Sequence, residues 1–142
     1  MDLKIFILTA IILLIVDILF ITYFFSAHYN ILIKQVQKSS MELNMFSSVF
    51  TYVLLVFGLY YFIIRDERSV LDAAILGTTI YGVFAGTNYS LLKNWSLKVA
   101  LIDTIWGGVL FGITTLAMQY IKGVYISDIS FNLFCYLNMM AT

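Results

Sequence analysis

Three polar side chains lie inside long apolar runs of this sequence: Asp17, Asn88 and Asp103. At a helical rise of 1.5 Å per residue, Asn88 and Asp103 would lie roughly 6 Å, and Asp17 roughly 12 Å, below the same membrane surface. A carboxylate that faces hydrocarbon is costly, so we expect these side chains to face one another. Helical spacing places Tyr81 on the same helix face as Asn88, and Trp106 on the same face as Asp103. The sequence therefore predicts an intramembrane polar cluster of these five residues.

The two carboxyls define the chemistry that this cluster could perform. Desolvation favours the neutral form of a carboxyl, so Asp17 and Asp103 could share a proton, hydrogen-bond to neighbours such as Tyr81, or pair with a ligand cation. One hypothesis is therefore a site for a proton or a polar ligand. The other is that these groups only form interhelical hydrogen bonds, which stabilise membrane helix packing by about 0.6 kcal/mol each on average. The sequence leaves both hypotheses open.

The rest of the sequence offers no further reactive site. It has no paired nucleophile and base and no phosphate-binding loop, so we expect no catalytic residues and no independent enzyme. His28 and Cys135 are the only residues of their types, which argues against a metal site and excludes an intramolecular disulfide. No cofactor is expected. The net charge is zero and the basic residues are spread singly, so nucleic-acid binding is not expected.

Composition assigns the chain to the membrane. Its residues are 62% hydrophobic and 11% charged, against roughly 45–50% and about 25% in soluble domains. Four apolar runs are long enough to cross a hydrocarbon core of roughly 30 Å as helices: residues 5–25, 45–64, 70–92 and 99–121. The first run is too long for the apolar region of a signal peptide and is read as an uncleaved helix. We therefore predict an all-α, polytopic membrane protein with a compact bundle of four transmembrane helices over residues 1–121.

The connections between the runs are short except for the first. Residues 26–44 mix lysines with apolar residues, which is typical of a helix lying in the membrane interface. Ser69 and Asp72 have the spacing of a capping box that begins the third span. Residues 122–142 follow the last span, and their apolar stretch is too short to cross the membrane. We predict that they form a short surface helix or a tail that docks on a partner.

An even number of spans places both termini on the same side of the membrane. Lysine and arginine residues in the connections normally indicate which side is cytoplasmic. Here four of them fall on each side, so the orientation stays open.

Small residues and aromatic residues follow two further patterns. Small residues at helical spacing let membrane helices approach closely, and those predicted at helix contacts are Gly82, Gly86, Gly107, Gly108 and Gly112. Tyr and Trp are enriched where the membrane meets water, and the aromatic residues interpreted in this way are Tyr23, Tyr29, Tyr52, Tyr60, Tyr61, Tyr89, Trp95, Trp106 and Tyr120.

Several positions together resemble one known family. They are Asp17, Tyr29, Tyr81, Gly82, Phe84, Thr87, Asn88, Lys93, Trp95, Asp103, Trp106 and Gly107. The pattern covers most of residues 1–121 and is similar to the small four-span membrane family known as domain of unknown function 2177, found in bacteria and some large DNA viruses. The resemblance implies a four-span fold and no particular activity. Ala85 and Ser96 stand where the family usually has an aspartate and a proline, and if that aspartate carries chemistry, this chain has lost it.

Two hypotheses for function follow. The first is a non-enzymatic structural or anchoring component of a larger membrane assembly, which contacts other membrane or capsid-type proteins through residues 122–142 and the first connection. Enrichment in Ile, Phe, Tyr, Asn and Lys is typical of AT-rich genomes and fits a viral copy, located in a virion inner membrane or a host endomembrane. The second is a small transporter or membrane-enzyme accessory that binds a proton or polar ligand at Asp17, Asn88 and Asp103. In both, the lipid bilayer is a partner.

Overall fold

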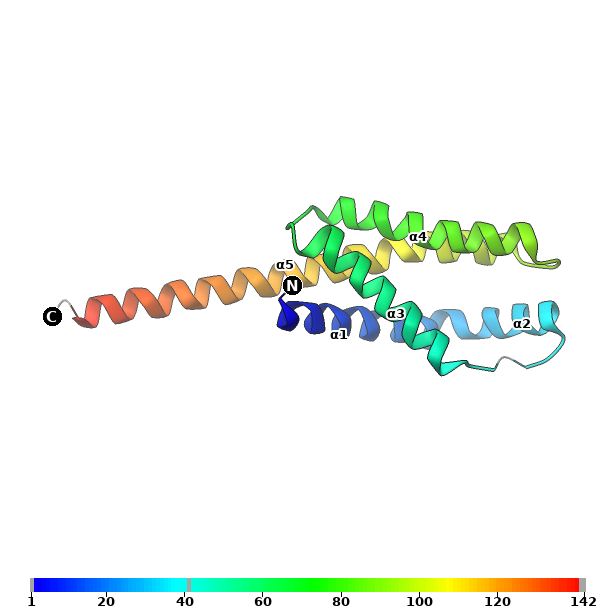
Figure 1. Ribbon diagram of the computed structural model, residues 1–142, viewed down its shortest axis with the longest axis horizontal. Helices are drawn as coiled ribbons and strands as arrows, with labels where there is room; N and C mark the ends of the chain where they lie inside the picture. The colour runs from blue at the N-terminus through cyan, green and yellow to red at the C-terminus, as the bar shows by residue number, and fades with distance from the viewer. Residues whose placement is uncertain (1, 41, 141–142) are drawn as a thin grey trace.

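The computed structural model describes residues 2–40 and 42–140, with side chains described except at residues 24, 25, 27, 28 and 124–140. Every regular element in this part of the chain is a helix (Figure 1). Four segments are long and apolar enough to cross a membrane: Leu3–Tyr23, Met45–Ile64, Val70–Leu91 and Leu97–Gly123. The predicted all-α class and the four spans are therefore confirmed. The predictions for the side chains of His28, Cys135 and the tail lie outside the described residues.

The first span and the first connection form one continuous helix. Helix α1 (Leu3–Phe20) passes through a short π-helix, η1 (Ile21–Phe25), into α2 (Ser26–Gln37), and Asp2 caps its start by accepting hydrogen bonds from two backbone N–H groups. The sequence over this stretch contains no glycine or proline that would end the helix. The first connection thus differs in detail from the expected interfacial helix, because it extends the span.

Helix α2 has a docking site on the bundle that explains this continuity. Its buried Leu32 packs with Trp95, Val99 and Ala100 near the turn that precedes α5 (Leu97–Met140). Lys38 then adopts a positive φ of 59°, which is incompatible with a continuing right-handed helix. Leu32, Ile33 and Val36 of the first connection therefore face protein, whereas Ile31 is 60% exposed.

The second span crosses the others obliquely and packs along only part of its length. Helix α3 (Met45–Leu59) continues into a π-helix, η2 (Tyr60–Ile64), and lies at an angle to the other helices in Figure 1. Its second half buries Leu55, Val56 and Leu59 in the core. Its first half presents side chains such as Phe46, which is 84% exposed. The beginning of α3 therefore stands apart from the packed core.

Helices α4 (Val70–Leu91) and α5 form the tightest contact of the bundle. A Cβ at Gly107 would collide with the ring of Tyr81, one at Gly108 with the hydroxyl of Thr78, and one at Gly77 with the Gly107 backbone. Such close backbone approach is how membrane helices gain packing contacts.

The other glycines predicted at helix contacts lie in looser surroundings. A Cβ at Gly82 would lie 3.2 Å from the methyl group of Thr104, and one at Gly112 would make ordinary contacts of 3.7 and 3.9 Å. Gly86 has no atom within 4 Å of a Cβ. Gly77, which was not among the predicted contacts, is as crowded as any of them.

Helix α4 begins as the sequence indicates. Ser69 and Asp72 form the predicted capping box, with each side chain hydrogen-bonded to the backbone N–H of the other. This arrangement satisfies two donors that a helix start leaves unpaired.

Helix α5 does not end with the fourth span. It continues through Lys122 and Gly123 to Met140 (Figure 1), so the residues after Lys122 extend this helix where a separate short helix or tail was expected. The physical reason is that Gly123 weakens a helix by only about 1 kcal/mol, and no proline follows it.

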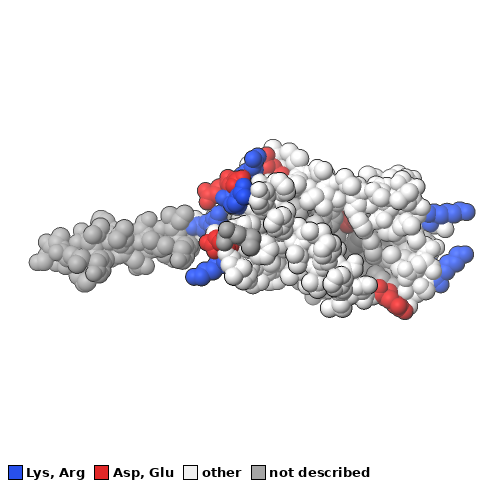
Figure 2. Space-filling view, in the orientation of Figure 1, with Lys and Arg blue, Asp and Glu red and all other residues white. Residues whose placement is uncertain are grey.

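The charged residues are separated into two groups by a broad apolar belt. In Figure 2 the lysine, arginine and most acidic side chains lie at the two ends of the described bundle, with uncharged surface between them. Exposed Ile, Leu, Val and Phe side chains cover that belt. This distribution is the one expected for a bundle that lies across a bilayer.

Candidate functional site

Asp17 is the centre of a polar cluster inside the bundle. It lies on α1 and is only 4% exposed. The Trp106 indole Nε1 donates a hydrogen bond of 2.8 Å to its Oδ1, and the Tyr52 hydroxyl donates one of 2.6 Å to its Oδ2. Trp106 belongs to α5 and Tyr52 to α3. One carboxylate therefore joins three of the four spans.

The indole of Trp106 is also held in place by a stacked aromatic ring. Phe20, less than one turn after Asp17 on the first helix, stacks on it with ring centroids 3.7 Å apart and planes 7° from parallel. The stacked pair and the hydrogen bond leave the indole little rotational freedom, so the donor is preorganised for the carboxylate.

Asp103 lies one turn before Trp106 on α5 and is half-buried. It is close enough to Asp17 for the two carboxyls to interact electrostatically. No described side chain forms a hydrogen bond or an ion pair with Asp103, and the two ion pairs of the described residues involve Arg65 and Lys122. Asp103 is thus an acid without a cationic partner in the described structure.

Two tyrosines from further helices complete the surroundings of the acids. Tyr81 of α4 packs on Gly107 and lies within electrostatic range of Asp17, Tyr52 and Asp103. Tyr29 of α2 lies beyond the apolar span, where burial, followed by the charge of Asp103, raises its pKa to about 12. At neutral pH Tyr29 is therefore an uncharged phenol that faces an acid.

Trp95 lies at the end of the cluster that is nearest the turn between α4 and α5. It is 9% exposed, and its ring meets Tyr29 edge-on at 6.1 Å between centroids. Its indole N–H is buried and has no hydrogen-bond acceptor among the described residues. Trp95 therefore contributes packing, whereas Trp106 contributes both packing and a hydrogen bond.

Four of the five residues predicted for the cluster come together: Asp17, Tyr81, Asp103 and Trp106. The fifth, Asn88, is half-buried two turns beyond Tyr81 on α4, and its side chain makes no hydrogen bond within the described part of the chain. Asn88 is therefore outside the hydrogen-bonded network.

Sequence reasoning missed the residue that completes the network, Tyr52, by interpreting it as an interfacial aromatic. Tyr52 lies seven residues into α3, which corresponds to about 10 Å at 1.5 Å per residue. That depth is below the level where interfacial tyrosines concentrate, and it is the signal that could have identified it. Tyr29, interpreted in the same way, also faces the cluster.

The chemistry available to the cluster follows from its donors and acceptors. Two carboxyls are surrounded by phenol and indole groups, all of which are neutral hydrogen-bond donors. No group of three or more His, Cys, Asp and Glu side chains gathers anywhere in the described residues. Figure 2 shows a small patch of acidic atoms within the uncharged surface, away from the charged ends. The arrangement can hold a proton, or a monovalent cation next to aromatic faces.

The comparisons with known proteins identify a family and no individual relative. No curated protein and no solved structure matches the chain. The model of a family described as a predicted membrane protein, DUF2177, matches residues 2–120. The match contains every residue of the cluster and confirms the resemblance inferred from their pattern. The chain therefore belongs to this family of predicted membrane proteins, and with four apolar helices it is an integral membrane protein.

Proposed function

We propose that this membrane protein is a small transporter that binds and releases a proton or a small cation at Asp17 and Asp103. The observation that supports this function is the proximity of the two carboxyls inside the bundle. Neither is paired with a basic side chain in the described structure. Two like charges in an apolar environment destabilise each other, and uptake of a proton or a cation relieves that repulsion.

The two acids have different roles in this proposal. An indole N–H can only donate, so Oδ1 of Asp17 always accepts from Trp106. With Tyr52 on its other oxygen, Asp17 is a fixed acceptor that the hydrogen bonds hold in place. Asp103 has no such donors, so it is the group on which an exchanging proton or cation resides.

The packing of α3 supports access to the site. The first half of α3 is exposed, and acidic atoms are visible within the uncharged surface in Figure 2. Aromatic rings lie beside the acids, among them the stacked Phe20 and Trp106, and rings of this kind attract desolvated cations by about 2 kcal/mol. These features favour an organic monovalent cation over a divalent metal ion.

The experiment that tests the proposal measures flux in liposomes. Purified protein is reconstituted with a pH-sensitive dye inside, and an imposed pH gradient is followed with and without a quaternary ammonium ion outside. Asp103→Asn should reduce flux to the level of empty liposomes. Glu42→Gln, which removes an exposed acid outside the cluster, is the charge-matched control and should keep it. Wild-type flux equal to that of empty liposomes, or full flux in the Asp103 variant, would contradict the proposal.

A second candidate function is anchoring within a larger membrane assembly, such as a virion membrane. The observation that favours it is the continuation of α5 to Met140 beyond the end of the bundle (Figure 1). A helix that extends past its own bundle offers a surface to other membrane or capsid-type proteins. The test compares the full chain with one that ends at Gly123 by sedimentation of gently solubilised native membranes. Loss of the large species on truncation supports anchoring, and an unchanged profile contradicts it.

A further inference from the structure

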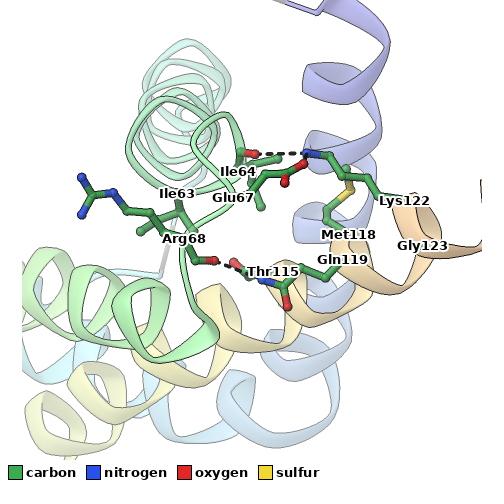
Figure 3. A pocket seen from close by; sticks show the side chains of 9 residues that line it. All are labelled: Ile63, Ile64, Glu67, Arg68, Thr115, Met118, Gln119, Lys122 and Gly123. Atoms are coloured by element: carbon green, nitrogen blue, oxygen red, sulfur yellow. Dashed lines mark hydrogen bonds and ion pairs between the residues drawn. The ribbon is translucent and has the colours of Figure 1, made fainter. Parts of the chain in front are cut away.

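A separate pocket of about 330 Å³ lies between α5 and the hairpin that joins α3 to α4 (Figure 3). It is far from the acid cluster, since Thr115 in its lining follows Asp103 by about 18 Å along α5 at 1.5 Å per residue. Ile63, Ile64 and Met118 form apolar walls and are at most 3% exposed. The pocket therefore has an apolar interior that continues the core.

Polar groups line the same pocket on the side of the hairpin. Lys122 Nζ donates to the Ile64 carbonyl oxygen at 3.2 Å and to Glu67 at 3.3 Å, and Gln119 Nε2 donates to the Arg68 carbonyl oxygen at 3.0 Å. An ammonium group has three N–H donors and a side-chain amide has two, so each group retains a donor for a further acceptor. In Figure 3 the guanidinium of Arg68 points away from these groups.

The lining also contains a buried polar atom without a partner. The hydroxyl of Thr115 is buried and makes no hydrogen bond in the described structure. Two other threonines of α5 differ, because Thr114 and Thr104 each donate to the carbonyl four residues earlier at 2.8 Å. A buried hydroxyl without a partner costs free energy, because it has lost its hydrogen bonds to water. A ligand oxygen in the pocket would remove that cost.

The position of the pocket along the spans indicates which oxygen-rich group the membrane offers at that level. The second and fourth spans end at Ile64 and Gly123, and both residues line the pocket. This is the level at which lipid phosphates meet the hydrocarbon core. At this level the donors can meet an acceptor-rich headgroup, and the apolar walls suit the first carbons of acyl chains.

We propose that this pocket binds the phosphate diester of a membrane phospholipid. The phosphate oxygens accept hydrogen bonds from Thr115, Gln119 and Lys122, and the glycerol and the first acyl carbons lie against Ile63 and Met118. The phosphate competes with Glu67 for Lys122. Glu67 is free to move aside because its side chain is 74% exposed.

Binding is measured on the full chain in a mild detergent by native mass spectrometry with added phosphatidylglycerol. Lys122→Gln removes one charge near the headgroup, worth about 1 kcal/mol, and should weaken binding about fivefold. Thr115→Val keeps the shape and removes the hydroxyl, with a similar expected loss of about fivefold. Lys4→Gln makes the same charge change outside the pocket and should bind as the wild type does.

A further variant changes binding in the opposite direction, which a folding defect cannot imitate. Glu67→Gln removes the anion that competes for Lys122 and should tighten phosphatidylglycerol binding about fivefold by the same charge estimate. Diacylglycerol, which has no phosphate, should not bind.

Three results would overturn the proposal. One is equal binding of diacylglycerol and phosphatidylglycerol. Another is full displacement of the lipid by inorganic phosphate at the same concentration, which would indicate a site for free phosphate. The third is wild-type affinity in both the Thr115 and the Glu67 variants.

Discussion

Trp106 donates its indole N–H to the carboxylate of Asp17 across 2.8 Å, although the two residues are 89 positions apart in the chain. The bond ties the first span to the last. Because Tyr52 bonds the other oxygen of the same carboxylate, α3 is held at this point as well. Asp17 is therefore an acceptor shared by helices α3 and α5 inside the bundle, and its removal should affect the packing of all three helices.

Replacing Trp106 with phenylalanine should destabilise the protein by about 1–3 kcal/mol, because it leaves a buried carboxylate oxygen without a donor. The measurement is the free energy of unfolding in detergent micelles. Trp95→Phe is the matched control, since it removes a similar ring whose N–H has no acceptor in the described structure. Equal losses in the two variants would show that the hydrogen bond to Asp17 contributes nothing.

The bond between Tyr52 and Asp17 can be isolated by a double-mutant cycle. Tyr52→Phe and Asp17→Asn, measured singly and together, should give a coupling energy of about 0.6–1.7 kcal/mol, the range of hydrogen bonds between membrane helices. Tyr23→Phe is the control, because Tyr23 is 76% exposed. If the losses of unfolding free energy at Tyr52 and Asp17 were additive, the 2.6 Å hydrogen bond would contribute nothing to stability.

Gly107→Ala should destabilise the bundle by about 1–3 kcal/mol, because the new methyl group would overlap the ring of Tyr81 and force α4 and α5 apart. Gly86→Ala adds the same methyl group on the neighbouring helix where nothing lies within 4 Å. That variant should be neutral or stabilised by up to about 1 kcal/mol, since alanine favours helix. Thermal unfolding of both variants tests the difference in sign.

Tyr29 should ionise with a pKa of about 12, well above the ordinary value for tyrosine, because burial and the charge of Asp103 both oppose the phenolate. Its contribution to stability is therefore complete below pH 10 and is lost as the pH rises through about 12. Ultraviolet absorbance of phenolate follows the titration, and Tyr29→Phe identifies the signal. Asp103→Asn should lower this pKa only in part, because burial, the larger cause, remains. An unchanged pKa in that variant would place Asp103 too far away to act.

The sequence by itself determined the environment, the number of spans and the local helix signals. Hydropathy runs report directly on lipid exposure, and the pairing of Ser69 with Asp72 depends only on residues within one turn. The membership of Asp17 and Asp103 in one cluster was also predictable, because acids at similar depth in hydrocarbon have few other places to face.

Only the tertiary structure decided which neutral groups meet those acids. Tyr52 reaches Asp17 because α3 crosses the bundle obliquely, and a crossing angle depends on side-chain packing over the whole helix. For the same reason Asn88 lies outside the network, Gly77 lies at the closest backbone contact, and Thr115 faces a pocket. Helical spacing identifies the face on which a side chain lies, whereas the arrangement of the neighbouring helices determines what that face contacts.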